Sequence, residues 1–400
     1  MSSILSIAYI ANIRLPTEKA HGYQIMKMCE ALADEGAHIV LTCPIRRQTN
    51  SVIQEAADPF DYYGIRRIFT VRYIANFDIF RIERYIPAGF FKFFFYIHSV
   101  VWGAYALYMV RKTSDAVYLH DDIPLGMLAT FFKIPLIYEV HGIPAGVGRL
   151  TVRFACGSST LLVGALTAHI RDRLIGEFGY DFAKTVILPD GVDLGLFSES
   201  HPRSYFRKKA GFLARGPLVG YVGTFTSLGY EKGVGSLIRA MALVREKYPD
   251  ATLVCVGGPD ELIPQYERLV AHSGIPKHAV CFTGHVNSSG AVLRMRACDV
   301  LVIPLPYNEF FAYHTSPLKL FEYMASRVPI VASDLPSLRE VISERTTVFA
   351  EPGNAASLAA GICCVLDDPR VAEERAEVAY TDVLSYAWRE RAKVVMGYIS

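Results

Sequence analysis

Short apolar runs typical of buried strands alternate with longer amphipathic stretches along most of this chain. Residues 3–10 and 37–43 have the composition of strands. Residues 22–35 between them repeat their apolar side chains with a helical period, as Ile25, Met28 and Leu32 show. Strands that alternate with helices favour a parallel sheet covered by helices on both faces. The alternation therefore predicts an α/β protein.

The same plan begins again in the second half. Residues 218–222 and 251–256 are expected strands, and residues 234–247 are the expected helix between them. A chain of 400 residues exceeds what one hydrophobic core ordinarily holds. We therefore expect two Rossmann-like domains whose parallel sheets face each other across a cleft.

The expected boundary lies near the loosely patterned, basic segment 203–209. The first domain is predicted to span residues 1–195 and the second residues 196–385. The C-terminal helix, residues 386–400, is expected to return to the first domain.

Composition narrows the class of protein. A formal net charge of +2 does not indicate a protein that binds nucleic acid. The eight cysteines show no C-x-x-C spacing, which fits a reducing compartment, and the N-terminus lacks the basic segment of a signal peptide. These features favour a cytoplasmic protein.

The longest apolar stretch spans residues 88–110 and is interrupted by Lys92 and His98. A membrane span needs roughly 20 clean apolar residues, so a helix packed on a sheet is one interpretation. The alternative is a helix with one face on a membrane surface, because basic residues flank the stretch. In that case the protein would lie at the inner face of the cell membrane. The flanking cations are Arg66, Arg67, Arg72, Arg81, Arg84, Arg111 and Lys112.

In open parallel sheets, ligands bind beyond the carboxyl ends of the strands. Residues 120–122 and 139–142 follow two expected strands of the first half, and residues 223–225 and 284–286 follow two of the second. The ends of the two sheets should together line the cleft.

Anion-binding features occur in the second half. A helix start presents free amide groups, and Pro317 just before the helical run 319–325 supports a start there. Lys232 opens another helix and could add a charge beside a diphosphate. The sequence contains no G-x-x-x-x-G-K-[ST] loop, no G-x-G-x-x-G after the first strand, no Asp-x-Asp pair and no G-x-S-x-G elbow.

The second half resembles the retaining GT-B-fold glycosyltransferases of family four (glycosyl transferases group 1). The stretches that carry the resemblance are residues 220–233, 253–258, 280–284 and, above all, 316–333, together with 187–193 followed by Phe197. The resemblance covers nearly the whole chain and is strongest over residues 187–342.

The resemblance implies a role for individual residues. Glu322 matches a carboxylate that binds the donor ribose, Lys232 a lysine that meets the donor phosphates, and His120 a histidine that contacts the transferred sugar. These three are the expected catalytic residues. The expected donor-binding residues are Gly22, Gly223, Thr224, Gly284, His285, Val286, His314, Thr315, Ser316, Pro317 and Leu318.

Two positions depart from the family. His314 stands where an E-x7-E signature has its first glutamate, so Glu309 nearby is a candidate substitute. Thr224 stands where many members place an arginine, and a threonine donates only one hydrogen bond. Glu309, His141 and Asp121 are further candidates for sugar or acceptor contacts.

The resemblance implies a hexosyltransferase that moves a sugar from a nucleotide-diphosphate donor with retention of configuration. Neither a cofactor nor a metal is expected. The first domain would bind the acceptor, which would be a glycan, a lipid-linked molecule or a small molecule, near residues 12–21 and 62–108. The second domain would bind the nucleotide sugar. Two alternatives remain open at this point: a nucleotide-sugar epimerase on the same fold, and a non-catalytic protein that binds sugar nucleotides.

Overall fold

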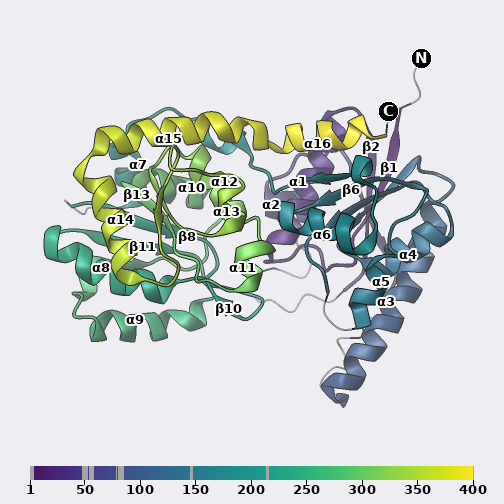
Figure 1. The fold of residues 1–400 in the computed structure, drawn as a ribbon, viewed down its shortest axis with the longest axis horizontal. Coiled ribbons are helices and arrows are strands. Elements are labelled where there is room, and N and C mark those ends of the chain that lie inside the picture. The colour runs from purple at the N-terminus through teal and green to yellow at the C-terminus, as the bar shows by residue number, and fades with distance from the viewer. Residues whose placement is uncertain are drawn as a thin grey trace. The chain divides into compact units, whose positions relative to one another are not determined.

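The chain forms two compact units, each built around its own sheet (Figure 1). The structure is a computed structural model that describes residues 4–46, 53, 58–77, 79, 85–144, 147–212 and 216–399. Unit 1 comprises Met1–Pro189 and Trp388–Ser400, and unit 2 comprises Asp190–Ala387. Two basic residues of the expected acceptor region, Arg81 and Arg84, and the side chain of Lys92 lie outside the described residues.

Unit 1 contains a seven-stranded parallel sheet in the order β3-β2-β1-β4-β5-β6-β7. The order reverses between β1 and β4, and the crevice beyond the carboxyl ends at such a reversal is where ligands bind in sheets of this type. The strands are β1 (Ser6–Ile10), β2 (His38–Pro44), β3 (Thr70–Ile74), β4 (Ala116–His120), β5 (Leu136–Val140), β6 (Thr160–Ala165) and β7 (Thr185–Ile187).

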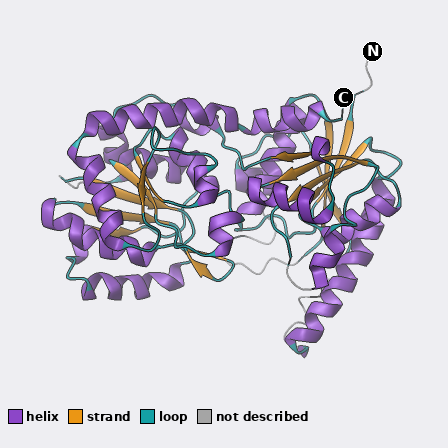
Figure 2. Ribbon diagram, viewed as in Figure 1, coloured by secondary structure: helices purple, strands orange, loops and turns teal. Residues whose placement is uncertain are grey.

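Helices cover both faces of this sheet (Figure 2). Local sequence sets their ends: Thr167 accepts a hydrogen bond from the Ile170 amide at the start of α6, and Gly179 ends that helix in the left-handed conformation. The helices are α1 (Ala20–Asp34), α2 (Pro59–Tyr63), α3 (Ala88–Val110), α4 (Ile123–Phe131), α5 (Val147–Val152), α6 (Ala168–Phe178) and α16 (Trp388–Gly397). Among them, α16 packs against α1, so the last helix of the chain belongs to unit 1.

Unit 2 contains a six-stranded parallel sheet in the order β12-β11-β8-β13-β14-β15 and a short antiparallel hairpin, β9 (Thr226–Ser227) with β10 (Tyr230–Glu231). The sheet strands are β8 (Leu218–Val222), β11 (Thr252–Val256), β12 (Val280–Phe282), β13 (Val300–Ile303), β14 (Ile330–Ser333) and β15 (Val348–Ala350). The helices are α7 (Arg203–Ala210), α8 (Val234–Lys247), α9 (Ile263–His272), α10 (Ser288–Ala297), α11 (Glu309–Tyr313), α12 (Leu318–Ala325), α13 (Pro336–Arg339), α14 (Ala355–Asp367) and α15 (Pro369–Val383).

The strands of unit 2 are apolar on both faces because each face carries its own core. Leu218 of β8 belongs to a core with α10 and α12, whereas its neighbour Val219 belongs to a second core with α8 and α14. Successive side chains of a strand point to opposite faces, so an unbroken apolar run fills both cores.

The predicted α/β class with two Rossmann-like parallel sheets is confirmed. Strand β8 and helix α8 have the bounds expected from their apolar patterns. No helix in the described part of the chain is both long enough and apolar enough to cross a membrane.

Candidate functional site

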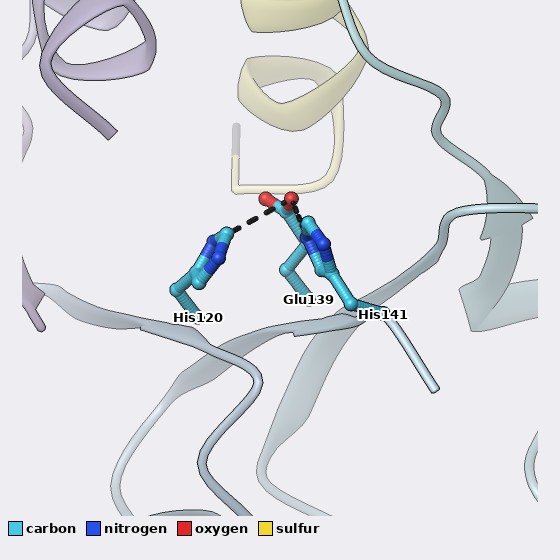
Figure 3. Close-up of side chains that lie close together, drawn as sticks. All are labelled: His120, Glu139 and His141. Carbon is cyan, nitrogen blue, oxygen red and sulfur yellow. Dashed lines mark hydrogen bonds and ion pairs between the residues drawn. The ribbon is translucent and has the colours of Figure 1, made fainter. Parts of the chain in front are cut away.

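Two histidines meet at the carboxyl edge of the unit 1 sheet. Strands β4 and β5 are parallel neighbours, and His120 at the end of β4 lies in register with Glu139 of β5. His141 follows β5 directly, so its side chain reaches the same edge. The ring centroids of His120 and His141 are 4.3 Å apart, and Figure 3 shows the two rings on either side of the Glu139 carboxylate.

Glu139 is the centre of a buried ion-pair network. The side chain is 1% exposed, and its Oε1 lies 2.6 Å from His141 Nε2 and 2.8 Å from Arg391 Nη2. The Tyr118 hydroxyl donates to Oε2 at 2.6 Å. Burial alone would raise the pKa of Glu139, but Arg391 and the hydrogen bond with His141 outweigh it and hold that pKa well below its usual range. Glu139 is therefore a carboxylate whose charge is compensated inside the unit.

The same three side chains have the atom types of a metal site. His120, Glu139 and His141 each offer a ligand atom, and these atoms lie within 4.8 Å of one another. The Arg391 guanidinium, however, forms an ion pair with Glu139 Oε1, the carboxylate oxygen that also faces both histidines. A permanent cation at this distance opposes a second one, so the arrangement favours the ion-pair network.

Two imidazoles at this edge, those of His120 and His21, have lowered pKa values. Burial, together with the neighbouring His141, keeps the pKa of His120 well below its usual range. Burial and Lys19 lower the pKa of His21, in the same cluster, to about 4. His120 Nδ1 is buried, lies 3.7 Å from Glu139 Oε1 and has no hydrogen-bond partner among the described residues. The nearby carboxylate favours a proton on Nδ1, which leaves the other ring nitrogen as an acceptor.

In unit 2, a glycine loop follows β8 and meets a lysine. Gly223 has a φ of 138°, and a Cβ there would lie 3.2 Å from Lys319 Cε. Lys232 Nζ donates to Thr224 Oγ1 at 2.7 Å in the same loop. Burial lowers the pKa of Lys232 to about 8. The structure thus brings together three predicted donor residues, Gly223, Thr224 and Lys232.

Lys319 is a site residue that the sequence reasoning missed. The ammonium lies 3.8 Å from the centre of the Tyr221 ring, and its Nζ has no hydrogen-bond partner in the described chain. Burial and the neighbouring Lys232 hold the pKa of Lys319 well below its ordinary range. Its position one helical turn before Glu322 was the signal that could have identified it, because residues three apart share a helix face.

Glu322 lies on α12, near Lys319. Burial raises the pKa of Glu322 to about 7, and Lys319 acts in the opposite direction. A carboxylate that is only half-ionised near neutral pH gains from a ligand that donates hydrogen bonds to its charged form. This property matches the expected role of Glu322 as an acceptor of hydrogen bonds from the ribose hydroxyls.

The two helix starts near these lysines differ. At α8, the Glu231 carboxylate accepts from the amides of Gly233 and Gly235 at 2.8 and 3.0 Å, so these amides are already bonded. At α12, the cap residue is Pro317, and no side chain in the described chain caps the helix. The start of α12 is therefore the one that presents amide groups to an anion.

Other predicted residues have local structural roles. The Ser316 hydroxyl accepts from the Asp190 amide at 3.0 Å, and the Asp121 carboxylate accepts from the His141 amide at 3.1 Å. His285 and Glu309 are exposed, Val286 packs against the core, and His314 ends α11 half-buried. A Cβ at Gly22 would lie 2.2 Å from the Tyr63 hydroxyl, so packing alone explains that glycine.

The predicted site residues thus divide between the two units. His120, His141, Asp121 and Gly22 lie in unit 1, and the residues from Gly223 to Glu322 lie in unit 2. Glu139, which pairs with both histidines, and its partner Arg391 were not singled out from the sequence. Two Rossmann-like units of this kind make up the GT-B fold.

Comparison with known proteins gives the family. Residues 216–368 match the family described as glycosyl transferases group 1. An uncharacterised glycosyltransferase of Methanocaldococcus jannaschii is 32% identical over 299 residues, which are 70% of this chain and 73% of that protein. The chain belongs to the group 1 glycosyltransferase family.

Two other comparisons extend this picture. Glycogen synthase of Mycobacterium tuberculosis is 29% identical over 288 residues; the match covers 66% of this chain and 63% of that enzyme's length. The crystal structure of Anabaena HepE in complex with UDP and glucose is similar with a TM-score of 0.72 at 17% identity, over 98% of both chains. The latter likeness is one of fold.

Proposed function

We propose that this protein is a retaining hexosyltransferase that uses a nucleotide-diphosphate sugar and no metal. The observation that carries the proposal is a pair of lysines in unit 2. Lys232 acts electrostatically on Lys319, which lies in the first turn of α12, and no side chain of the described residues caps that helix. Two amines beside free backbone amides fit the two phosphates of a nucleotide diphosphate. The complex of HepE with UDP and glucose supports a donor of this kind.

The donor would be held by complementary chemistry along α12. The amides of Thr315 and its neighbours and the two lysine ammonium groups would bind the diphosphate, and burial has prepared both lysines to gain a proton when the anion arrives. The Glu322 carboxylate would accept from the two ribose hydroxyls. The loop Gly284, His285 and Val286 would hold the base through backbone groups.

The reaction breaks the bond between the anomeric carbon and the departing diphosphate oxygen and forms a bond from the same carbon to the acceptor oxygen. The acceptor proton passes to the departing phosphate oxygen, so attack occurs on the face that the leaving group vacates. Charge that develops on the diphosphate is stabilised by groups already in place, which is preorganised electrostatic catalysis. His120 orients the sugar through its unprotonated ring nitrogen.

The acceptor is proposed to be a glycan, a lipid-linked molecule or a small molecule, bound by unit 1. Residues 12–19 lead into α1, whose first turn carries His21 close enough to His120 to act on it electrostatically. We propose that the protein works in the cytoplasm, and a lipid-linked acceptor would bring unit 1 to the inner face of the membrane.

A screen of nucleotide sugars by thermal stabilisation tests the donor site. A donor at 100 times its dissociation constant should stabilise the protein by about 2.7 kcal/mol, and Glu322→Ala should abolish the shift. A shift that survives Glu322→Ala intact would show that the assigned site is wrong. Product analysis then separates the alternatives. An epimerase converts donor alone to a new sugar nucleotide, and a non-catalytic protein yields no product with any acceptor.

Two further measurements test the anomeric configuration of the product and the dependence of transfer on a metal. NMR of the product should show the anomeric configuration of the donor. Transfer should continue in the presence of EDTA. Inversion, or a loss of transfer that added Mg²⁺ restores, would contradict the corresponding part of the proposal.

A further inference from the structure

Helix α3 is apolar on the face that packs on unit 1 and on the opposite face as well. Trp102, Ala106, Leu107 and Val110 are buried in the core of unit 1. These residues fix the helix against the sheet along one side. In Figure 1 one end of α3 projects beyond the rest of unit 1. A soluble helix fixed in this way ordinarily turns polar residues outward.

The outward face instead carries a stripe of large apolar and aromatic side chains. Their spacing of three and four residues places them along one side of the helix. Phe90 and Val101 are 65% and 64% exposed, and Tyr108 is 60% exposed. Single exposed apolar residues are common, but a contiguous row marks an interaction surface. The stripe consists of Phe90, Phe94, Ile97, Val101, Tyr105 and Tyr108.

Neighbouring helices also expose apolar side chains. Helix α4 packs beside α3, and α5 packs beside α4. Exposed residues at or just after their ends have the same character as the stripe: Phe131, Phe132, Leu150 and Phe154. Exposed apolar side chains therefore occur on three neighbouring helices.

The charged residues that directly follow these three helices are basic. Residues 88–110 contain no Asp or Glu, and α3 is followed directly by Arg111 and Lys112. Lys133 follows α4 and Arg153 follows α5. Tyrosine and other aromatic side chains suit a boundary where one end is apolar and the other is in contact with water, and cations suit anionic headgroups.

We propose that the α3 stripe and its basic rim dock unit 1 on the surface of an anionic lipid bilayer. The apolar stripe would enter the boundary between headgroups and acyl chains, and Arg111, Lys112, Lys133 and Arg153 would meet lipid phosphates. Docking needs no donor and no reaction. Only one consequence of docking rests on the proposed function: the acceptor would be a lipid-linked molecule presented at that surface.

Co-sedimentation with vesicles tests the docking. The full chain is mixed with vesicles of phosphatidylcholine alone and of phosphatidylcholine with phosphatidylglycerol. We expect binding to the anionic vesicles and weak binding to the neutral ones. The F94S/V101S double variant should bind at least tenfold more weakly, because two anchors become polar. The R111Q/K112Q variant should lose about fivefold per charge, and this loss should shrink in high salt.

Matched controls use exposed residues away from the surface. L243S/V394S removes two exposed apolar side chains elsewhere, and K208Q/K277Q removes two exposed cations of unit 2. Both controls should bind vesicles like the unchanged protein. Circular dichroism melting should show that every variant is folded.

Three outcomes would overturn the proposal. The first is that the unchanged protein does not bind anionic vesicles, and the second is that F94S/V101S binds them equally well. The third is a dimer that depends on α3 in sedimentation velocity, without vesicle binding. That result would mean that a second copy of the chain covers the stripe. The donor screen is read separately. If donor binding fails but vesicle binding follows α3, the proposed function fails and the docking surface stands.

Discussion

Arg391 of α16 forms a buried ion pair with Glu139 of β5, with 2.8 Å between Nη2 and Oε1 and side chains 3% and 1% exposed. The arginine Nε also donates to the Pro189 carbonyl at 2.9 Å, so one side chain joins the last helix to the strand that carries the histidine partner. Glu139 in turn bonds His141. The orientation of the histidine cluster therefore depends on a residue near the end of the chain.

Arg391→Met should strongly destabilise unit 1. The variant leaves the Glu139 carboxylate buried with one fewer partner, and breaking a buried pair costs about 3–5 kcal/mol. Because the two units need not unfold together, the readout is hydrogen exchange at β4 and β5 rather than a single melting temperature.

Two further variants test whether loss of the Arg391–Glu139 ion pair causes the destabilisation. Arg389→Met removes an exposed pair with Glu35 and should cost under about 1 kcal/mol. The double variant R391M/E139Q should regain part of the lost protection, since no charge is then left unpaired. Equal exchange in R391M and the unchanged protein would contradict this account.

Donor affinity should be greatest between about pH 7 and pH 8. Free Lys232 loses its proton above about pH 8, while the diphosphate complex retains it, so affinity falls by up to tenfold per pH unit there. Free Glu322 gains a proton below about pH 7, whereas ribose binding favours its ionised form, so affinity falls in that direction too. Calorimetric titration across pH 5–10 measures both limbs. K232M should make the alkaline limb less steep without removing it, because Lys319 also gains a proton on binding, and E322Q should remove the acid limb; a flat profile would argue against both assignments.

Glu322→Gln should stabilise unit 2 at pH 8 while it weakens donor binding. The pKa of Glu322 is raised above its unfolded value, so ionisation costs the folded state free energy at pH above about 7. That cost is absent below about pH 4.5, where both states are protonated. The expected gain at pH 8 is roughly 1–3 kcal/mol and should vanish at pH 4. Thermal melting at both pH values measures it, and a gain of equal size at the two would point to a different cause.

Gly233→Ala should destabilise unit 2 by several kcal/mol. Gly233 has a φ of 85°, and an added Cβ would lie 1.7 Å from the Pro304 carbonyl oxygen. The matched control is Gly176→Ala in the last turn of α6, where a Cβ meets nothing within 4 Å. That substitution should stabilise by about 0.5–1 kcal/mol, because alanine loses less backbone entropy in a helix. Chemical denaturation followed by circular dichroism compares them, and a tolerated alanine at 233 would mean that the β10–α8 loop can move.

Elements that consist of one unbroken apolar run could be predicted from the sequence. Strand β8 is an example, since all five of its residues are buried. Strand β3 escaped detection because three of its five residues are exposed, so it lacks that pattern. Glu139 was noted only as part of a strand end, and its partner Arg391 lies in another part of the chain. The pairing depends on tertiary packing, which local periodicity does not encode.

The same limit applies to the donor pocket. Lys232 and Glu322 were named because they match family positions, whereas Lys319 in the same motif was passed over. Its importance arises from burial over the Tyr221 ring beside Gly223, and those contacts join β8 and its loop to α12. A lysine in an amphipathic helix is usually solvated, and only the tertiary structure shows that Lys319 is buried.

The place of Arg391 in the chain also affects how the protein is made. Unit 2 is continuous and can fold as soon as residue 387 has left the ribosome. Residues 1–189 of unit 1 have already emerged by then, but Glu139 stays without the Arg391 guanidinium until α16 arrives. The segment translated before unit 2 is therefore completed after it, and a chain truncated before residue 388 should have a loosened N-terminal half beside a folded unit 2.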